Sequence, residues 1–117
     1  MYRLAEKKLS LDEHTRNILH QCRDVICSSY PDATIVLYGS QARGDAGAES
    51  DLDMLILLDK SITPEEKNAI HDRLYEIALA EEVVISMIIK NSENWNLPIS
   101  QATSLYQAIQ KEGIQVV

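Results

Sequence analysis

Two aspartates separated by a single residue are the side chains of this sequence best suited to chemistry. Asp51 and Asp53 open an apolar run that reaches Leu58, and we expect this run to form a strand. Alternate residues of a strand point to the same face, about 6–7 Å apart, so the two carboxylates project together. Carboxylates this close repel each other unless a cation lies between them. Mg²⁺ takes oxygen ligands and favours one or two carboxylates together with phosphates, so we predict that Asp51 and Asp53 bind it.

A glycine–serine turn precedes this pair and supplies groups that suit a phosphate. Gly39 permits a backbone conformation and a close ligand approach that a side chain would hinder. Ser40 follows where a short helix would begin, with free N–H groups and a hydroxyl that can meet an anion. Arg43 is the only basic residue between Tyr38 and Asp59, and it is therefore the local candidate to offset the remaining phosphate charge.

These residues also carry a family resemblance. Gly39-Ser40, ten further residues and then Asp51-Leu52-Asp53 resemble the signature of the DNA-polymerase-β-like nucleotidyltransferases. The longer segments 39–44 (GSQARG) and 50–53 (SDLD) are most similar to the minimal nucleotidyltransferases (MNT). Members of that group are short antitoxins encoded beside a HEPN-domain toxin, and some transfer AMP from ATP to a tyrosine of that toxin. The resemblance covers about residues 33–90.

The resemblance implies a role for each matching residue. Asp51 and Asp53 would be the catalytic residues and the Mg²⁺ ligands, while Gly39, Ser40 and Arg43 would bind the nucleotide. The implied enzyme is a Mg²⁺-dependent nucleotidyltransferase that uses ATP to adenylylate a HEPN-domain toxin and so neutralises it. The implied partner makes a hetero-oligomer with this chain, and no nucleic acid or membrane takes part.

The third strand departs from the pattern of larger relatives, which carry a further carboxylate there. The matching position is Ser86, and a hydroxyl is a poor base and a weak metal ligand. Glu82 lies on the same face of the predicted strand 82–89 and could substitute only with a backbone shift. Two alternatives therefore stay open: an antitoxin that binds the same toxin without catalysis, and a two-component nucleotidyltransferase of small molecules such as antibiotics.

The elements around the motif follow from capping and periodicity. A capping box of Ser10 and Glu13 begins a helix that ends before Pro31, and Thr63 caps a second helix after the aspartate strand. Apolar residues at helical spacing mark the buried face of each helix. Strands are expected at 33–38, 51–58 and 82–89.

The C-terminal part is expected to form one more helix, over about residues 100–112. Ser100 is its predicted cap, and Gly113 is its predicted end. Trp95, which precedes this helix, either packs against the sheet or lies at a partner interface.

Together the elements predict one domain, residues 1–117, with an α+β fold. They give a small mixed sheet with helices packed mainly on one side, as the polymerase-β-like fold requires. The lead-in 1–9 is expected to fray, and the tail 114–117 either docks on the sheet or stays free for a partner.

Composition narrows the classes of function. The chain has 117 residues, of which 45% are hydrophobic and 25% are charged, and its formal net charge is -7. This acidity argues against a long nucleic-acid footprint, which normally shows as a basic face. The two cysteines, Cys22 and Cys27, lack a metal-type spacing, and no apolar run reaches the length of about 18 residues needed to span a membrane. We therefore expect a cytoplasmic protein.

Overall fold

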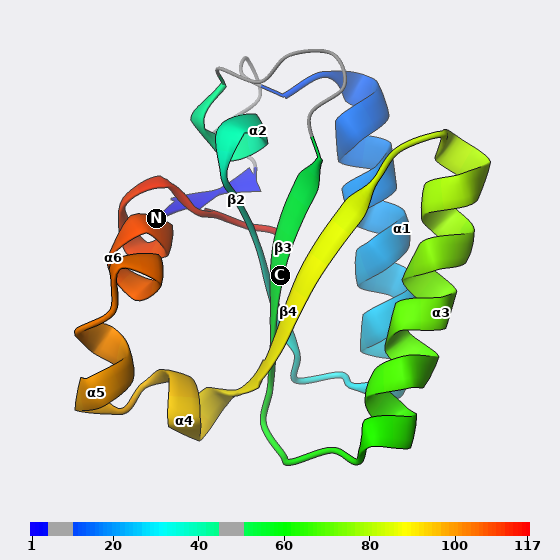
Figure 1. Ribbon diagram of the computed structural model, residues 1–117. Coiled ribbons are helices and arrows are strands. Elements are labelled where there is room, and N and C mark those ends of the chain that lie inside the picture. Colours follow the sequence, from blue (N-terminus) through cyan, green and yellow to red (C-terminus); the bar gives the residue numbers. More distant parts are fainter. Residues whose placement is uncertain (5–10, 45–50) are drawn as a thin grey trace.

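A mixed sheet organises the protein (Figure 1). The computed structural model describes residues 1–4, 11–44 and 51–117. In these residues the sheet has five strands in the order β1-β5-β2-β3-β4. The strands are β1 (Tyr2–Arg3), β2 (Thr34–Tyr38), β3 (Leu52–Leu58), β4 (Ile85–Asn91) and β5 (Ile114–Gln115). β2 runs antiparallel to both of its neighbours, whereas β1 is parallel to β5 and β4 is parallel to β3. The predicted α+β class with a mixed sheet is confirmed.

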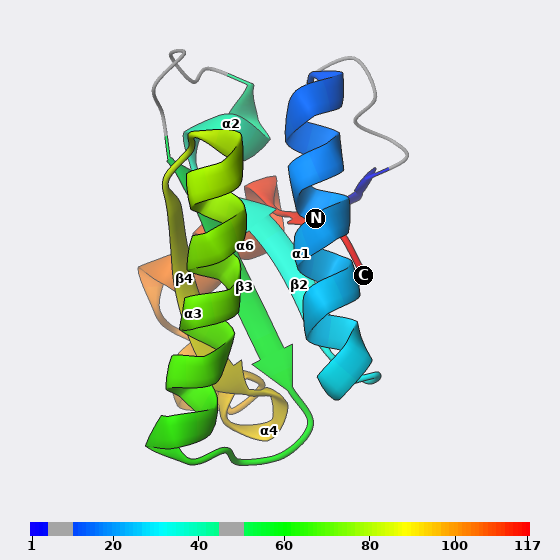
Figure 2. The same cartoon turned by 90° about the vertical axis from the view of Figure 1, so that its right-hand side faces the viewer.

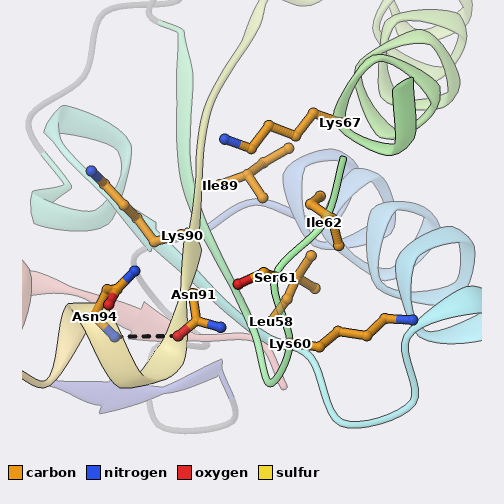
Figure 3. Close-up of a pocket in the computed structure, with 9 residues that line it drawn as sticks. All are labelled: Leu58, Lys60, Ser61, Ile62, Lys67, Ile89, Lys90, Asn91 and Asn94. Carbon is orange, nitrogen blue, oxygen red and sulfur yellow. Dashed lines mark hydrogen bonds between the residues drawn. The ribbon is translucent and has the colours of Figure 1, made fainter. Parts of the chain in front are cut away.

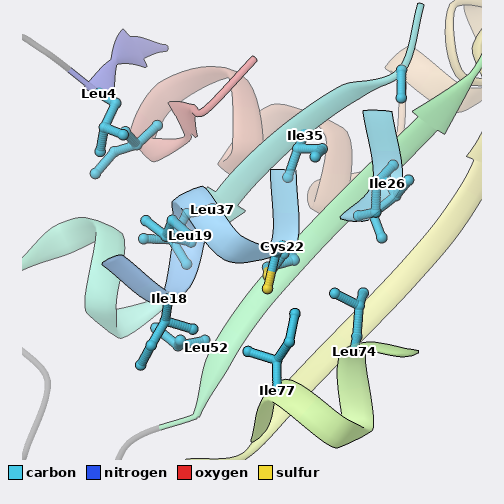
Figure 4. Close-up of a cluster of buried hydrophobic side chains, with 14 of the residues drawn as sticks. Leu4, Ile18, Leu19, Cys22, Ile26, Ile35, Leu37, Leu52, Leu74 and Ile77 are labelled. Carbon is cyan, nitrogen blue, oxygen red and sulfur yellow. The ribbon is translucent and has the colours of Figure 1, made fainter. Parts of the chain in front are cut away.

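Two long helices cover one face of the sheet, and we call them the helix layer. α1 spans Glu13–Ser29 and α3 spans Pro64–Glu81, and the two lie side by side in both views (Figure 1 and Figure 2). Their apolar stripes pack on the sheet in a buried cluster (Figure 4). Fully buried members of this cluster include Ile18, Leu19, Ile35, Leu37 and Leu74. The prediction that helices pack mainly on one side of the sheet holds for these two long helices.

Both helices of the layer begin at capped residues. The Thr63 hydroxyl accepts a hydrogen bond from the Glu66 N–H, and the Glu66 carboxylate accepts one from the Thr63 N–H, which completes a capping box. The N-cap of α1 is Asp12, whose carboxylate accepts a hydrogen bond from the Thr15 N–H at 2.7 Å. The predicted cap, Ser10, lies outside the described residues.

Short helices cover the opposite face of the sheet. They are α4 (Ser92–Trp95), α5 (Pro98–Gln101) and α6 (Ser104–Glu112). Through Trp95 of α4 and Ile109 of α6 they form a second buried cluster with Val36, Leu55 and Leu57 of the sheet, whereas α5 contributes no buried residue. Trp95 is only 5% exposed, and its ring lies 5.0 Å from the ring of Tyr106. Of the two alternatives for Trp95, the structure shows the packed one.

The last helix begins four residues later than predicted. Ser100 lies inside α5, and α6 starts after Thr103, whose hydroxyl accepts a hydrogen bond from the Tyr106 N–H. Thr103 therefore provides the cap that the sequence pattern assigned to Ser100. Gly113 follows the end of α6 as its C-cap, as predicted.

Both chain ends join the sheet. β5 lies between β1 and β2, and Ile114 in β5 is fully buried, so the tail docks on the sheet. The expectation that the N-terminal residues fray is wrong for Tyr2 and Arg3, because these residues pair with β5 and satisfy its free backbone groups. No helix in the described ranges combines the length and the apolar character that crossing a bilayer requires.

Strand β4 also begins later than predicted, at Ile85 instead of residue 82. Glu82 has a φ of 56°, in the left-handed region, and it ends α3 by donating its N–H to the carbonyls of Ala78 and Leu79. Glu82 therefore lies outside the strand, and the prediction that it shares a strand face with Ser86 is wrong.

Candidate active site

The glycine–serine turn and the two aspartates meet at one end of the sheet. β2 and β3 are antiparallel, and their register pairs Tyr38, the last residue of β2, with Asp53. The turn after β2 therefore lies beside the start of β3, at the end of the sheet where Figure 1 shows α2. We call this the aspartate end. A Cβ atom built on Gly39 would collide with Oδ2 of Asp53, so the carboxylate lies directly against the glycine backbone.

Gly39 also has a backbone conformation that other residues rarely adopt. Its φ is 78° and its ψ is -160°, a region that is essentially restricted to glycine. Gly39 is the N-cap of α2, which spans Ser40–Arg43 and ends at Gly44 with a φ of 81°. This single turn of helix places the Ser40 hydroxyl at its start and the Arg43 guanidinium at its end, so the three residues predicted to bind a phosphate come from one tight segment.

The electrostatics of the aspartate end favour a bound cation. Burial, followed by the negative charge of Asp51, raises the pKa of Asp53, and the positive charge of Arg43 opposes this rise. Burial, followed by the charge of Asp53, likewise raises the pKa of the Tyr38 phenol. Burial is the larger cause of both shifts and the neighbouring negative charge is the smaller one, and a cation bound here would offset that charge.

The oxygen donors of this end fit Mg²⁺. Asp51 and Asp53 would hold the ion, which would supply positive charge to stabilise the phosphates of a nucleotide. No group of three or more candidate metal-ligating side chains occurs among the described residues. Mg²⁺ commonly combines one or two carboxylates with water and phosphate oxygens.

Strand β4 presents Ser86 to the two aspartates. The parallel register pairs Ser86 with Asp53, and the Ser86 hydroxyl lies 3.5 Å from Oδ2 of Asp51, to which it donates a hydrogen bond. The third strand thus offers a hydroxyl at the aspartate end, at the position where the sequence comparison with larger nucleotidyltransferases indicated a missing carboxylate.

A third acidic residue, which sequence reasoning missed, lies at the same end. Glu112 is the last residue of α6, and its Oε1 accepts a hydrogen bond from the Gly39 N–H at 3.4 Å. Both of its carboxylate oxygens lie 3.4 Å from Nη1 of Arg43. The only sequence signal was an acid at a helix C-terminus, where the helix dipole disfavours negative charge.

A hollow lies elsewhere, at the other end of β3 and β4 (Figure 3). Its volume is about 320 Å³. Its lining residues are Leu58, Lys60, Ser61, Ile62, Lys67, Ile89, Lys90, Asn91 and Asn94. The lysines do not converge, because the Lys60 ammonium lies over the Tyr30 ring, 5.3 Å from its centroid. None of the predicted site residues lines this hollow.

Comparisons with known proteins identify the family of this chain. The family model for the nucleotidyltransferase domain matches residues 19–114. Two proteins of Methanocaldococcus jannaschii, named as candidate protein adenylyltransferases, are similar in sequence. MJ0141 is 33% identical over 82 residues, which cover 70% of this chain and 76% of the relative. MJ0604 is 34% identical over 79 residues, which cover 68% of this chain and 72% of the relative.

A solved structure is similar in fold. It is a toxin-antitoxin crystallised with AMP-PNP, and its superposition has a TM-score of 0.55 at 16% sequence identity. The match covers 89% of this chain and 72% of that chain. At this level of identity the likeness concerns the fold alone.

Proposed function

Because this chain belongs to the nucleotidyltransferase domain family, we propose that it transfers AMP from ATP to a partner protein. We further propose that the partner is a HEPN-domain toxin, which this chain binds as an antitoxin and neutralises. The observation that carries the proposal is the contact between the Asp53 carboxylate and the Gly39 backbone, beside Asp51. That contact joins the proposed cation site, Asp51 and Asp53, to the proposed phosphate site of Gly39, Ser40 and Arg43, which we call the phosphate seat. Such a transferase needs both sites.

Names of similar proteins support the choice of a protein as the acceptor. Two sequence relatives are named as candidate protein adenylyltransferases. A structural neighbour is a toxin-antitoxin crystallised with an ATP analogue. The net charge of -7 suits a partner with a basic surface.

In the proposed reaction the residues of the aspartate end bind and orient ATP. The Gly39 N–H and the Ser40 hydroxyl hold the phosphates, and Arg43 offsets their charge. Asp51 and Asp53 hold Mg²⁺, which supplies charge stabilisation when bound. A hydroxyl oxygen of the partner forms a bond to the α-phosphorus, the bond from that phosphorus to the bridging oxygen breaks, and pyrophosphate leaves. The hydroxyl proton passes to water.

The direct test is transfer of label from α-labelled ATP to the proposed partner, a HEPN-domain toxin, with Mg²⁺ present. Replacing both aspartates, by Asp51→Asn with Asp53→Asn, should lower labelling by at least about a thousandfold. Asp59→Asn makes a similar change at the exposed turn after β3 and should label as wild type does. Equal labelling by the double variant and the wild type would refute the assignment of the two aspartates.

A second function is favoured by one observation, the hydroxyl of Ser86 in place of a carboxylate beside Asp51. In this alternative the chain neutralises the toxin by contact alone. Cells that express the toxin would then be rescued by the double aspartate variant as well as by the wild type. Loss of rescue with the double variant, while it still binds the toxin in a pull-down, would favour catalysis.

A further inference from the structure

The Glu112 carboxylate contacts the same groups that the proposed function assigns to phosphate. It accepts a hydrogen bond from the Gly39 N–H and lies 3.4 Å from the Arg43 guanidinium with both oxygens. Its side chain is 19% exposed and that of Arg43 is 46% exposed. A carboxylate is the closest side-chain analogue of a phosphate oxygen pair, because arginine binds both through the same planar arrangement of donors.

The fold holds Glu112 in this position through β5. The register of β5 with β2 pairs Ile114 with Leu37, so the residues just before Ile114 run past the end of β2 towards Gly39. Gly113 fixes the backbone between α6 and β5, because a Cβ atom there would lie 2.5 Å from the Ile109 carbonyl oxygen and 2.8 Å from Cγ1 of Val36. The glutamate is therefore placed beside the turn by buried backbone, and its carboxylate can leave by rotation of its own side chain.

Helix stability does not explain an acid at this position. Glu112 ends α6, and a negative charge at a helix C-terminus interacts unfavourably with the helix dipole. Residues that break a local rule of this kind are commonly found at functional sites. Here Arg43 and the Gly39 N–H, both of which belong to the aspartate end, offset the unfavourable interaction of the Glu112 charge with the helix dipole.

We propose that Glu112 is a built-in competitor of the nucleotide, which fills the phosphate seat of Gly39 and Arg43 until a nucleotide displaces it. This inference rests on the nucleotide site of the proposed function. A ligand with several phosphate charges displaces the carboxylate, whereas a nucleoside without phosphate does not. Glu112 is thus a specificity-determining residue, which makes binding depend on the phosphate tail.

The proposal predicts the sign of a binding change. When a competing group occupies a site most of the time, the apparent affinity falls by the fraction of molecules in which the site is open. If the seat is open in about one molecule in ten, removing the competitor tightens binding about tenfold. A residue that instead supported the seat would weaken binding when removed.

The experiment measures AMP-PNP affinity by titration calorimetry with Mg²⁺ and without any partner protein. We expect Glu112→Gln, which keeps the side-chain size and removes the charge, to bind AMP-PNP about tenfold more tightly than wild type. Adenosine affinity should be the same in both proteins. Glu82→Gln removes the same charge at the end of α3 without altering a partner of Gly39, and it should leave AMP-PNP affinity within twofold of wild type.

A second variant is needed because the side chain introduced by Glu112→Gln could still accept a hydrogen bond from the Gly39 N–H. Glu112→Ala removes both contacts and should tighten AMP-PNP binding at least as much as Glu112→Gln. Unchanged or weaker binding by both variants, when their melting temperatures show that they fold, would overturn the proposal. Tighter binding without any transfer to the partner would uphold the role of Glu112 and refute the adenylylation, so the two failures are distinguishable.

Discussion

The aspartate end and the helix layer of this protein differ in what their residues are packed against. At the aspartate end a glycine with a positive φ lies against one carboxylate, and a second carboxylate lies near the first. In the helix layer both helices begin at N-cap residues and their inward side chains are buried, although α3 also ends in an acid, Glu81, and its C-cap Glu82 has a positive φ. The difference indicates that burial in the helix layer stabilises the fold. This stability offsets the backbone strain and the charge repulsion at the aspartate end, where the groups lie in positions that suit a ligand.

Polar contacts also join the two helices of the layer to each other. Nε2 of His14 in α1 lies 2.7 Å from Oε2 of Glu81 in α3. Near the other end of the layer, the Tyr30 hydroxyl donates a hydrogen bond to Glu66 at 3.1 Å. The layer is thus held at both ends as well as through its buried cluster, and changes within it should alter stability without altering the site.

The largest expected effect is on the buried cluster of the layer. Leu74→Ala should lower the free energy of unfolding by about 3 kcal/mol, because it leaves a cavity under α3. Denaturant titration measures this loss, and the AMP-PNP affinity of the folded protein should not change. Leu79→Ala is the matched control on the same helix, since Leu79 is 61% exposed, and it should stay within about 0.5 kcal/mol of wild type. A large loss of affinity in Leu74→Ala would contradict the separation of the two regions.

The next effect is at the turn. Gly39→Ala places a Cβ atom against Asp53, and the resulting displacement should lower kcat/KM for AMP transfer about a hundredfold. Gly44→Ala also puts a side chain at a positive φ and serves as the control for backbone strain alone. If both variants lose the same activity, strain rather than the contact with Asp53 is responsible.

A smaller effect is expected at the cap of α1. Asp12→Ala should lower stability by about 1 kcal/mol at pH 7. Hydrogen bonds from the side chain and then the N–H of Thr15 lower the pKa of Asp12, so the folded state favours the charged carboxylate. Its contribution is complete above about pH 5 and is lost as the pH falls through the lowered pKa, below about 4. Denaturant titrations at pH 7 and pH 3 should show the deficit shrink, and a deficit independent of pH would contradict this account.

The smallest effect has the opposite sign. Asp53→Asn removes a charge that burial and Asp51 disfavour, so in EDTA it should raise the free energy of unfolding by about 0.5 kcal/mol. The same variant should lose AMP transfer. Thermal melts of this variant and of Asp59→Asn measure the difference, and a destabilised Asp53→Asn would show that the carboxylate also has a structural role.

Much of the fold follows from short sequence patterns. The cap at Thr63, the strand that carries Asp53 and the apolar faces of the long helices were predicted, because each depends on residues within one or two turns or one strand. The reciprocal bond of Glu66 was not predicted, and Asp51 lies just before the strand instead of inside it. Gly39 was predicted in the same way, since the need for a flexible residue at a tight turn is local. The late start of β4 was missed, because nothing local shows that Glu82 adopts a left-handed conformation.

The sequence by itself indicated which residues of the aspartate pair and the turn could form a site, because the residues concerned are near neighbours in the chain or on adjacent strands. Their chemistry stays a prediction. Only the tertiary structure decided that the tail lies between β1 and β2 and brings Glu112 to Gly39. These residues are 73 positions apart, and their contact depends on how β5 pairs with β2. Strand pairing of this kind is set by the burial of whole elements, which local patterns do not encode.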